Sequence, residues 1–211
     1  MQSPPPNTPA PDTSGWYDDH ARAFFEETVG IELPHAYEEF LPRLPAGGSI
    51  LDAGCGSGRD SRRFRDMGFQ VEAFDVSREM VRLAREHTGL RVRHLDFLNA
   101  DFHPVHDGVF ANASLLHVTP EDLPGVLRRL AAALKPAGVF FASFKHGQGE
   151  HLKDDQLYVC RRDEAAVRKA ILHCGLLEAE RLWTTADTRP GRAKEQWLHL
   201  LATRNALPII S

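Results

Sequence analysis

The sequence predicts an α/β fold, a doubly wound and mostly parallel sheet with helices on both faces. From Ser49 onward, short apolar strand segments alternate with amphipathic helix segments, which is typical of parallel sheets. The last two strand segments, 176–185 and 196–203, are joined by a loop alone, so we expect them to be antiparallel. The 211 residues show no internal repeat and suit one domain.

Local signals support each element in turn. Apolar side chains at helical spacing predict a helix around Ala21–Thr28, and a second helix lies within Pro34–Pro45. Capping residues begin three later helices, at Ser77, Thr119 and Asp163. The expected strands are 49–53, 69–74, 91–95, 108–113, 138–144, 176–185 and 196–203. The expected later helices are 58–67, 119–134, 163–174 and one that begins at Ser77 and carries Met80, Val81 and Ala84.

The composition is that of an ordinary soluble globular protein, with 42% hydrophobic and 26% charged residues. A net charge of −4 argues against general affinity for nucleic acid, which needs a surplus of Lys and Arg. Three cysteines without CxxC spacing exclude a disulfide framework or zinc ribbon and indicate a reducing cytoplasm. No run approaches the roughly twenty apolar residues of a membrane span, and we expect no secretory signal.

Composition also sets off the ends of the chain. Residues 1–15 contain five prolines among small polar residues, so we expect a disordered tail that cannot bury enough apolar area to order itself. Residues 16–204 are predicted to form a single domain, and their first part, 16–46, a helical cap. A short tail is expected at 205–211.

The segment Asp52–Gly58 is the most informative stretch, because glycine occupies alternate positions after a predicted strand and before a helix. Such glycines let the backbone turn tightly and approach a ligand closely, and the following helix start presents free N–H groups. The dinucleotide fingerprint G-x-G-x-x-G/A fails, since the sixth position is Arg59 or Ser61. The remaining pattern is D-x-G-x-G-x-G.

Two further acids end the next two strands. Asp75 follows the glycines by about twenty residues, the place from which a carboxylate reaches ribose hydroxyls in doubly wound folds. Asp96 ends the third strand, where a carboxylate can accept from an adenine amino group beside an apolar wall at Phe97. Together with the glycines, these acids favour a nucleoside ligand.

With these residues the chain, from about 16 to 203, resembles the class I S-adenosylmethionine-dependent methyltransferases, which are Rossmann-like. The motifs that carry the resemblance are Leu51–Gly58, Asp75, Asp96-Phe97 and Leu134–Gly138. Within that superfamily the chain looks most like small bacterial tellurite-resistance-like methyltransferases. It departs at Ala137, where the family usually has a second glycine.

The resemblance implies a seven-stranded sheet whose last strand is inserted antiparallel, with S-adenosylmethionine as cofactor. It implies that Gly54, Gly56 and Gly58 pack against the methionine part, that Asp75 holds the ribose and that Asp96 holds the adenine. The full set of candidate cofactor-binding residues is Asp52, Gly54, Gly56, Gly58, Asp75, Val76, Asp96, Phe97, Asn112, Tyr17 and Arg22.

The segment Trp16–Arg22 resembles the lid of related methyltransferases. Tyr17 and Arg22 are then expected to close over the methionine moiety and exclude water. The alternative is an amphipathic helix that only covers an edge of the sheet.

The segment after the fourth strand bears on the acceptor. Asn112–His117 lacks the Asn-Pro-Pro-aromatic tetrad of enzymes that methylate adenine or amide nitrogens. His117 is a candidate general base in the transfer pocket, although a structural histidine is the more common outcome. His94, Asp101, His103 and His106 have no ordered ligand spacing, so no metal site is expected.

Three late cations are candidates for acceptor binding. Lys145, Arg189 and Arg192 would form a cationic pocket for an anionic acceptor. The alternative is a solvated charged hairpin in which Glu195 pairs with an arginine.

These observations predict an S-adenosylmethionine-dependent methyltransferase that acts on a small molecule. Because a sulfonium already carries an activated methyl group, catalysis requires chiefly in-line alignment of the nucleophile. The alternatives are a methyltransferase on tRNA or protein and a protein that binds S-adenosylmethionine without methylating.

Overall fold

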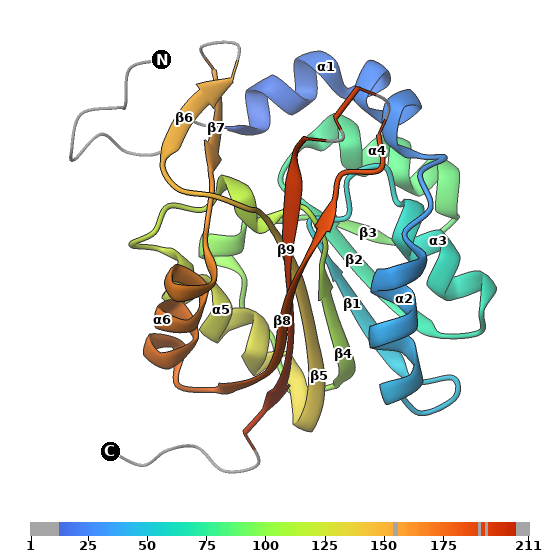
Figure 1. The fold of residues 1–211 in the computed structure, drawn as a ribbon. Helices are drawn as coiled ribbons and strands as arrows, with labels where there is room; N and C mark the ends of the chain where they lie inside the picture. Colours follow the sequence, from blue (N-terminus) through green and yellow to red (C-terminus); the bar gives the residue numbers. More distant parts are fainter. Residues whose placement is uncertain (1–12, 154–155, 190, 193, 206–211) are drawn as a thin grey trace.

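The computed structural model describes residues 13–153, 156–189, 191–192 and 194–205. A seven-stranded sheet in the order β3-β2-β1-β4-β5-β9-β8 runs through its centre (Figure 1). β9 is antiparallel to both of its neighbours, while the strands from β3 to β5 are parallel, which confirms the predicted sheet. The strands are β1 (Ser49–Ala53), β2 (Gln70–Asp75), β3 (Val92–His94), β4 (His106–Ala111), β5 (Leu134–Lys145), β8 (Leu177–Ala186) and β9 (Gln196–Arg204).

Helices cover both faces because alternate strand residues are apolar on both sides. Val109 and Phe140 face the cluster that includes α5 and α6, whereas Phe110 and Phe141 face the cluster that includes α2 and α3. α4 also packs on this second face, against Ala73 of β2 and its neighbours. The helices are α1 (Thr13–Thr28), α2 (Pro34–Phe40), α3 (Arg59–Asp66), α4 (Arg78–Thr88), α5 (Leu123–Ala132) and α6 (Glu164–Cys174).

Helix α1 crosses above the carboxyl ends of the parallel strands (Figure 1). Ala21 packs against Met80 and Leu83 of α4, which fixes the middle of the helix. No helix among the residues described is long and apolar enough to span a membrane.

A two-stranded hairpin, β6 (Glu150–Lys153) and β7 (Leu157–Cys160), stands between β5 and α6 and was not predicted. Its strands are too short to give a clear alternation signal in the sequence. Leu157 and Val159 pack on Trp16 and Leu116, so the hairpin supports the beginning of α1.

Several predicted boundaries were wrong, and β4 spans His106–Ala111 rather than 108–113. α1 begins at Thr13, so residues 13–15 of the predicted tail are helical, and the rest of that tail lies outside the described residues. α5 begins at Leu123, after a turn in which Thr119 Oγ1 accepts from Asp122 N (3.1 Å). β5 begins at Leu134 rather than near 138.

The departure at Ala137 has a structural cost. Ala137 has φ +62°, in the left-handed region where glycine is unstrained. A Cβ in this region costs about 1–2 kcal/mol. The position lies near the start of β5, far from the carboxyl ends of the strands.

Candidate functional site

A cavity of about 1180 Å³ opens at the carboxyl ends of the parallel strands. Its lining comes from the loop after β1, the ends of β2 and β4, α1, and the segment between β8 and β9. Ligands of doubly wound sheets bind at this edge. The volume exceeds the few hundred Å³ of many single-ligand pockets, so there is room for a nucleoside and a second small molecule.

The glycines of the Asp52–Gly58 segment differ in their surroundings. All three have positive φ, and a Cβ on Gly54 would lie 2.5 Å from Ser114 Cβ. A Cβ on Gly58 would lie 2.7 Å from Thr88 Cγ2 of α4, whereas one on Gly56 would meet only Phe24, at 3.6 Å. Gly54 and Gly56 line the cavity. Gly56 therefore gives a ligand the closest open approach to the backbone.

Asp75 stands beside this loop at the end of β2. Its carboxylate accepts from Gly56 N (2.9 Å) and Ser77 N (3.0 Å), and the residue is only 9% exposed. Burial raises the pKa of Asp75 above its ordinary value, although the backbone N–H donors oppose the rise. The loop and the carboxylate thus hold each other in place at the cavity wall.

Asp96 and Phe97 continue the same wall. The Asp96 carboxylate accepts from Leu98 N (3.0 Å), and the Phe97 ring meets Phe74 edge to face at 5.4 Å between centroids. Both residues line the cavity, as do Val76 and Asn112. A row of carboxylates at successive strand ends, next to an open glycine cradle, suits the hydroxyl and amino donors of a nucleoside.

Three predicted contact residues lie outside this lining. Asp52 is buried beneath the loop, where it accepts from Ser61 Oγ (2.5 Å), and burial raises its pKa. Gly58 packs against α4 instead. Arg22 is exposed and pairs with Glu26 (2.8 Å). Because a helix turns about 100° per residue, Arg22 is about 140° from Tyr17 around α1 and cannot share its face.

Helix α1 forms the roof of the cavity. Trp16, Tyr17, Phe24 and Thr28 are among its lining residues. The Asp18 carboxylate accepts from Ser77 Oγ (2.5 Å) and Glu79 N (3.1 Å), which ties the helix to the beginning of α4. The helix therefore covers the cavity itself rather than only an edge of the sheet.

His117 lies in the lining with both ring nitrogens engaged. Its Nδ1 is 2.6 Å from the Tyr158 carbonyl oxygen, so Nδ1 carries the proton, and Nε2 accepts from the Tyr17 hydroxyl at 2.8 Å. Burial lowers the pKa of His117 to about 4, so the ring is neutral at pH 7. The lone pair that a general base would use is already bound to the α1 roof.

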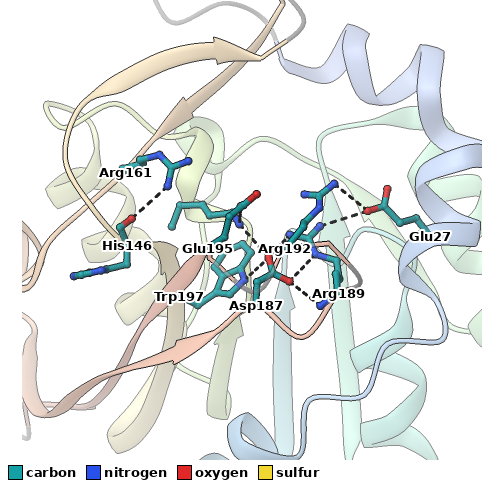
Figure 2. A network of polar contacts seen from close by, with 9 residues as sticks. Glu27, His146, Arg161, Asp187, Arg189, Arg192, Glu195 and Trp197 are labelled. Carbon is teal, nitrogen blue, oxygen red and sulfur yellow. Dashed lines mark hydrogen bonds and ion pairs between the residues drawn. The ribbon is translucent and has the colours of Figure 1, made fainter.

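The predicted cations come together, but with carboxylate partners, and Figure 2 shows Arg189 and Arg192 beside Asp187 and Glu27. Asp187 accepts from Lys145 Nζ (3.1 Å), Arg189 Nε (2.9 Å) and Trp197 Nε1 (3.0 Å). Glu195 pairs with Lys145 rather than with an arginine. Lys145 and Asp187 are buried, so the group is not a solvated hairpin. We call Lys145, Asp187, Arg189, Glu195 and Trp197 the Asp187 cluster.

The roof contributes one more acid to this end of the cavity. Glu27 Oε1 of α1 lies 3.6 Å from Arg189 and 3.3 Å from Arg192, which links α1 to the segment between β8 and β9 (Figure 2). With Glu27, three acids face the three predicted cations. This pairing could not be predicted from local sequence patterns, because Glu27 lies over 160 residues from its partners.

The histidines weighed as metal ligands do not converge. His94 ends β3, at the carboxyl ends of the parallel strands, and its Nε2 lies 2.8 Å from the Val76 carbonyl oxygen. His106 begins β4, at the amino ends of these strands. Within the part of the chain that the structure describes, no three His, Cys, Asp or Glu side chains are grouped to hold a metal ion.

Comparison with known proteins identifies relatives of this arrangement. Residues 50–138 match the family model described as a methyltransferase domain. A ubiquinone biosynthesis O-methyltransferase of Xanthomonas axonopodis pv. citri is 36% identical over 106 residues, 47% of this chain and 44% of that protein. The namesake of Xylella fastidiosa is 30% identical over 139 residues, covering 62% and 54%. The chain spans about half the length of these curated relatives.

Solved structures share the fold over nearly the whole chain. The 1,6-didemethyltoxoflavin-N1-methyltransferase of Burkholderia thailandensis, solved with S-adenosylhomocysteine, has a TM-score of 0.73 at 22% identity and covers 97% of this chain and 93% of its own. The [4+2]-cyclase SpnF has a TM-score of 0.69 at 17% identity, covering 98% and 100%. The narrower resemblance to tellurite-resistance-like methyltransferases stays a prediction.

Proposed function

We propose that this chain is a class I S-adenosylmethionine-dependent methyltransferase that methylates a small-molecule acceptor, and its similarity to a methyltransferase domain over residues 50–138 supports the proposal. The observation that carries the proposal is the cavity, which joins the Gly56–Asp75 cradle to a roofed second region with room for an acceptor. Bound S-adenosylmethionine supplies a methyl group that its sulfonium has already activated.

The cofactor-binding roles follow from the wall residues. Asp75 would accept from the ribose hydroxyls and Asp96 from the adenine amino group, with Phe97 and Val76 as apolar walls. Gly54, Gly56, Tyr17 and Asn112 would enclose the methionine part. Asp52 and Gly58 would not contact the cofactor; they would hold the glycine loop in shape from outside the cavity.

The chain's own contribution to the reaction is alignment and exclusion of water. α1 and the β6–β7 hairpin cover the cavity, so a bound acceptor has few orientations open to it. His117 is neutral and bonded to Tyr17, so we assign it to holding the roof rather than to proton removal. Acceptors that need little help to lose a proton suit this site best.

A small acceptor is favoured over tRNA or protein because the roof would have to move away for a macromolecule. The similar proteins point the same way, since one is named for methylating 1,6-didemethyltoxoflavin and others for ubiquinone biosynthesis. Binding without methylation is the second candidate, because a cyclase has the same fold. A reducing compartment such as the cytoplasm fits the three buried free thiols, Cys55, Cys160 and Cys174.

An anionic acceptor is the narrower proposal, supported by the cations at the cavity mouth. Asp187 holds Lys145 and Arg189. Among the acids that the structure describes, Arg192 contacts only Glu27, at 3.3 Å, so it is the cation that can most easily take an acidic group of the acceptor as its partner. An acidic group on the acceptor would then replace Glu27. Glu27→Gln should lower the KM of anionic acceptors about threefold, whereas Arg192→Gln should raise it about tenfold. A higher KM in both variants would instead make the Glu27 contact a simple support for the roof.

Turnover tests the function directly. Purified protein with S-adenosylmethionine is offered phenols, thiols and heteroaromatic amines, including 1,6-didemethyltoxoflavin, and S-adenosylhomocysteine is measured with the methylated product. We expect formation of both with at least one small acceptor. Cofactor binding with methylation of bulk tRNA or protein alone, or with no methylation at all, would favour the alternatives.

A further inference from the structure

The cavity extends past the cofactor wall to the strands β8 and β9, where Thr185 and His199 line it. None of the roles described above uses these two residues. His199 is 8% exposed, although it is a polar side chain in the sheet. Buried polar groups usually have hydrogen-bonding partners, so the burial of this polar pair at the cavity wall needs an explanation.

The sheet register relates the pair to the cofactor wall. His199 of β9 is directly opposite Ser143 of β5, and Ser143 Oγ donates to Asn112 Oδ1 (2.7 Å). Side chains of paired residues share a face. Since neighbouring strands are about 4.8 Å apart, His199 lies roughly 10 Å from Asn112 along this face. That span is the length of a two-ring molecule.

His199 is held firmly but incompletely bonded. Its ring stacks on Trp183 at 5.2 Å between centroids, and its Nε2 lies 2.8 Å from Thr185 Oγ1. Its Nδ1 is buried and has no partner among the residues described. Burial lowers the pKa of His199 to about 4, so the ring carries no charge at pH 7.

The pair keeps a spare donor in either histidine tautomer. If the Thr185 hydroxyl donates to Nε2, the Nδ1–H donor is unused. If Nε2–H donates to Thr185, the threonine hydroxyl proton is unused, and Thr185 lines the cavity. The pair can therefore present either a donor or a lone pair, whichever the ligand requires.

The charges nearby do not compete for this role. Lys145 and Arg189 are satisfied by Asp187, and Lys145 also by Glu195. The pair adds no charge of its own, which leaves this part of the cavity suited to an uncharged polar group rather than to an ion.

We propose that Thr185 and His199 form the specificity-determining subsite for the acceptor, binding an uncharged carbonyl or amide group while the reacting atom lies near Asn112. This inference rests on the proposed methyl transfer. The acceptor class is a small molecule of about two rings that carries a neutral carbonyl or amide at the end away from the methylated atom. An acidic group, where present, lies at the mouth beside Arg192.

Equilibrium binding with S-adenosylhomocysteine present tests the subsite. The uncharged probe is quinazoline-2,4-dione and the anionic probe is 1-naphthoate. Thr185→Val, which keeps the shape of the side chain, and His199→Phe, which keeps a stacking ring, should each raise the Kd of the dione about three- to tenfold, the effect of one lost hydrogen bond. The Kd of 1-naphthoate should change less than about twofold.

Matched controls separate this effect from unfolding. Thr184 is exposed on the other face of β8, so Thr184→Val should leave both probes unaffected, and Thr185→Ser should restore dione binding. In ¹⁵N-histidine NMR spectra recorded at a dione concentration near its wild-type Kd, the dione should shift the His199 resonances of the wild type more than those of Thr185→Val. Normal binding of S-adenosylhomocysteine without dione binding, or with an unchanged dione Kd in both variants, would overturn the subsite. Failure to bind S-adenosylhomocysteine would overturn the proposed function instead.

Discussion

At the scale of single residues, the glycines of one motif have different tasks. Gly56 faces the cavity and its added Cβ would meet little, whereas Gly58 packs closely on α4. The sequence predicts that both positions need glycine. It does not show which one faces the ligand, because that depends on where α4 lies against the loop.

Alanine substitutions should separate the two tasks. Gly58→Ala combines positive φ with a 2.7 Å approach to Thr88, so we expect it to lower the free energy of unfolding by about 2–4 kcal/mol. Gly56→Ala should cost only about 1–2 kcal/mol but weaken S-adenosylmethionine binding about tenfold. Urea unfolding and calorimetric titration of both variants check this, and the opposite ranking would refute the assignment.

Two neutral histidines should make stability depend on pH. The pKa of His117 and of His199 falls from 6.5 to about 4 on folding, because burial penalises the charged rings. The unfolded chain therefore binds more protons between these values, and stability is full above pH 6.5 and declines toward pH 4. Each ring contributes at most about 1.4 kcal/mol per pH unit.

Urea unfolding at pH 7, 6 and 5 measures that slope. His117→Gln and His199→Gln should each reduce the slope of the unfolding free energy against pH by up to about 1.4 kcal/mol per pH unit. The carboxylates are the same in the wild type and the variants, so they do not affect this difference. Exposed His173, whose Nδ1 bonds only the Lys169 carbonyl of its own helix, is the matched control. A slope that neither variant changes would mean that both rings keep their ordinary pKa in the folded protein.

At the scale of elements, α1 decides whether the cavity is closed. The sequence predicts a lid, and periodicity identifies the face that carries Tyr17. Arg22 lies outside the cavity lining because the turn of the helix places it about 140° from Tyr17. The β6–β7 hairpin, which supports the lid, was not predicted because its strands are too short to give an alternation signal. The residues against which it packs are also distant in sequence.

The bond from Asp18 to α4 gives a test of the lid. Partial burial would raise the pKa of Asp18, but hydrogen bonds from Ser77 and the Glu79 backbone hold it below its usual range. Asp18→Ala removes both bonds and should destabilise docking of α1 by about 1–2 kcal/mol. Amide hydrogen exchange of α1 should accelerate about tenfold, and cofactor affinity should fall.

Asp19, which is exposed beside it, provides the matched control. Asp19→Ala should leave the exchange rates of α1 unchanged. Equal acceleration in the two variants would show that helix propensity, rather than the bond to α4, governs the lid.

At the scale of the whole molecule, the sheet topology brings the site together. The strand ends and their acids were predictable, because local patterns fix where a strand stops and parallel strands stop at one edge. The partners of Lys145 were not, since Asp187 and Glu195 reach it only through the β5–β9 register. Long-range register also sets His199 opposite Ser143, which no local pattern records.

The central claim is that the cavity binds S-adenosylmethionine through Asp75. Calorimetric titration of the wild type, Asp75→Ala and Asp107→Ala tests it most directly. Asp107 pairs with Lys135 (2.8 Å) at the opposite edge of the sheet and controls for loss of a structural carboxylate. We predict one site in the wild type, an affinity at least about tenfold lower in Asp75→Ala and normal affinity in Asp107→Ala. A folded, ligand-free wild type that does not bind S-adenosylmethionine would contradict the account.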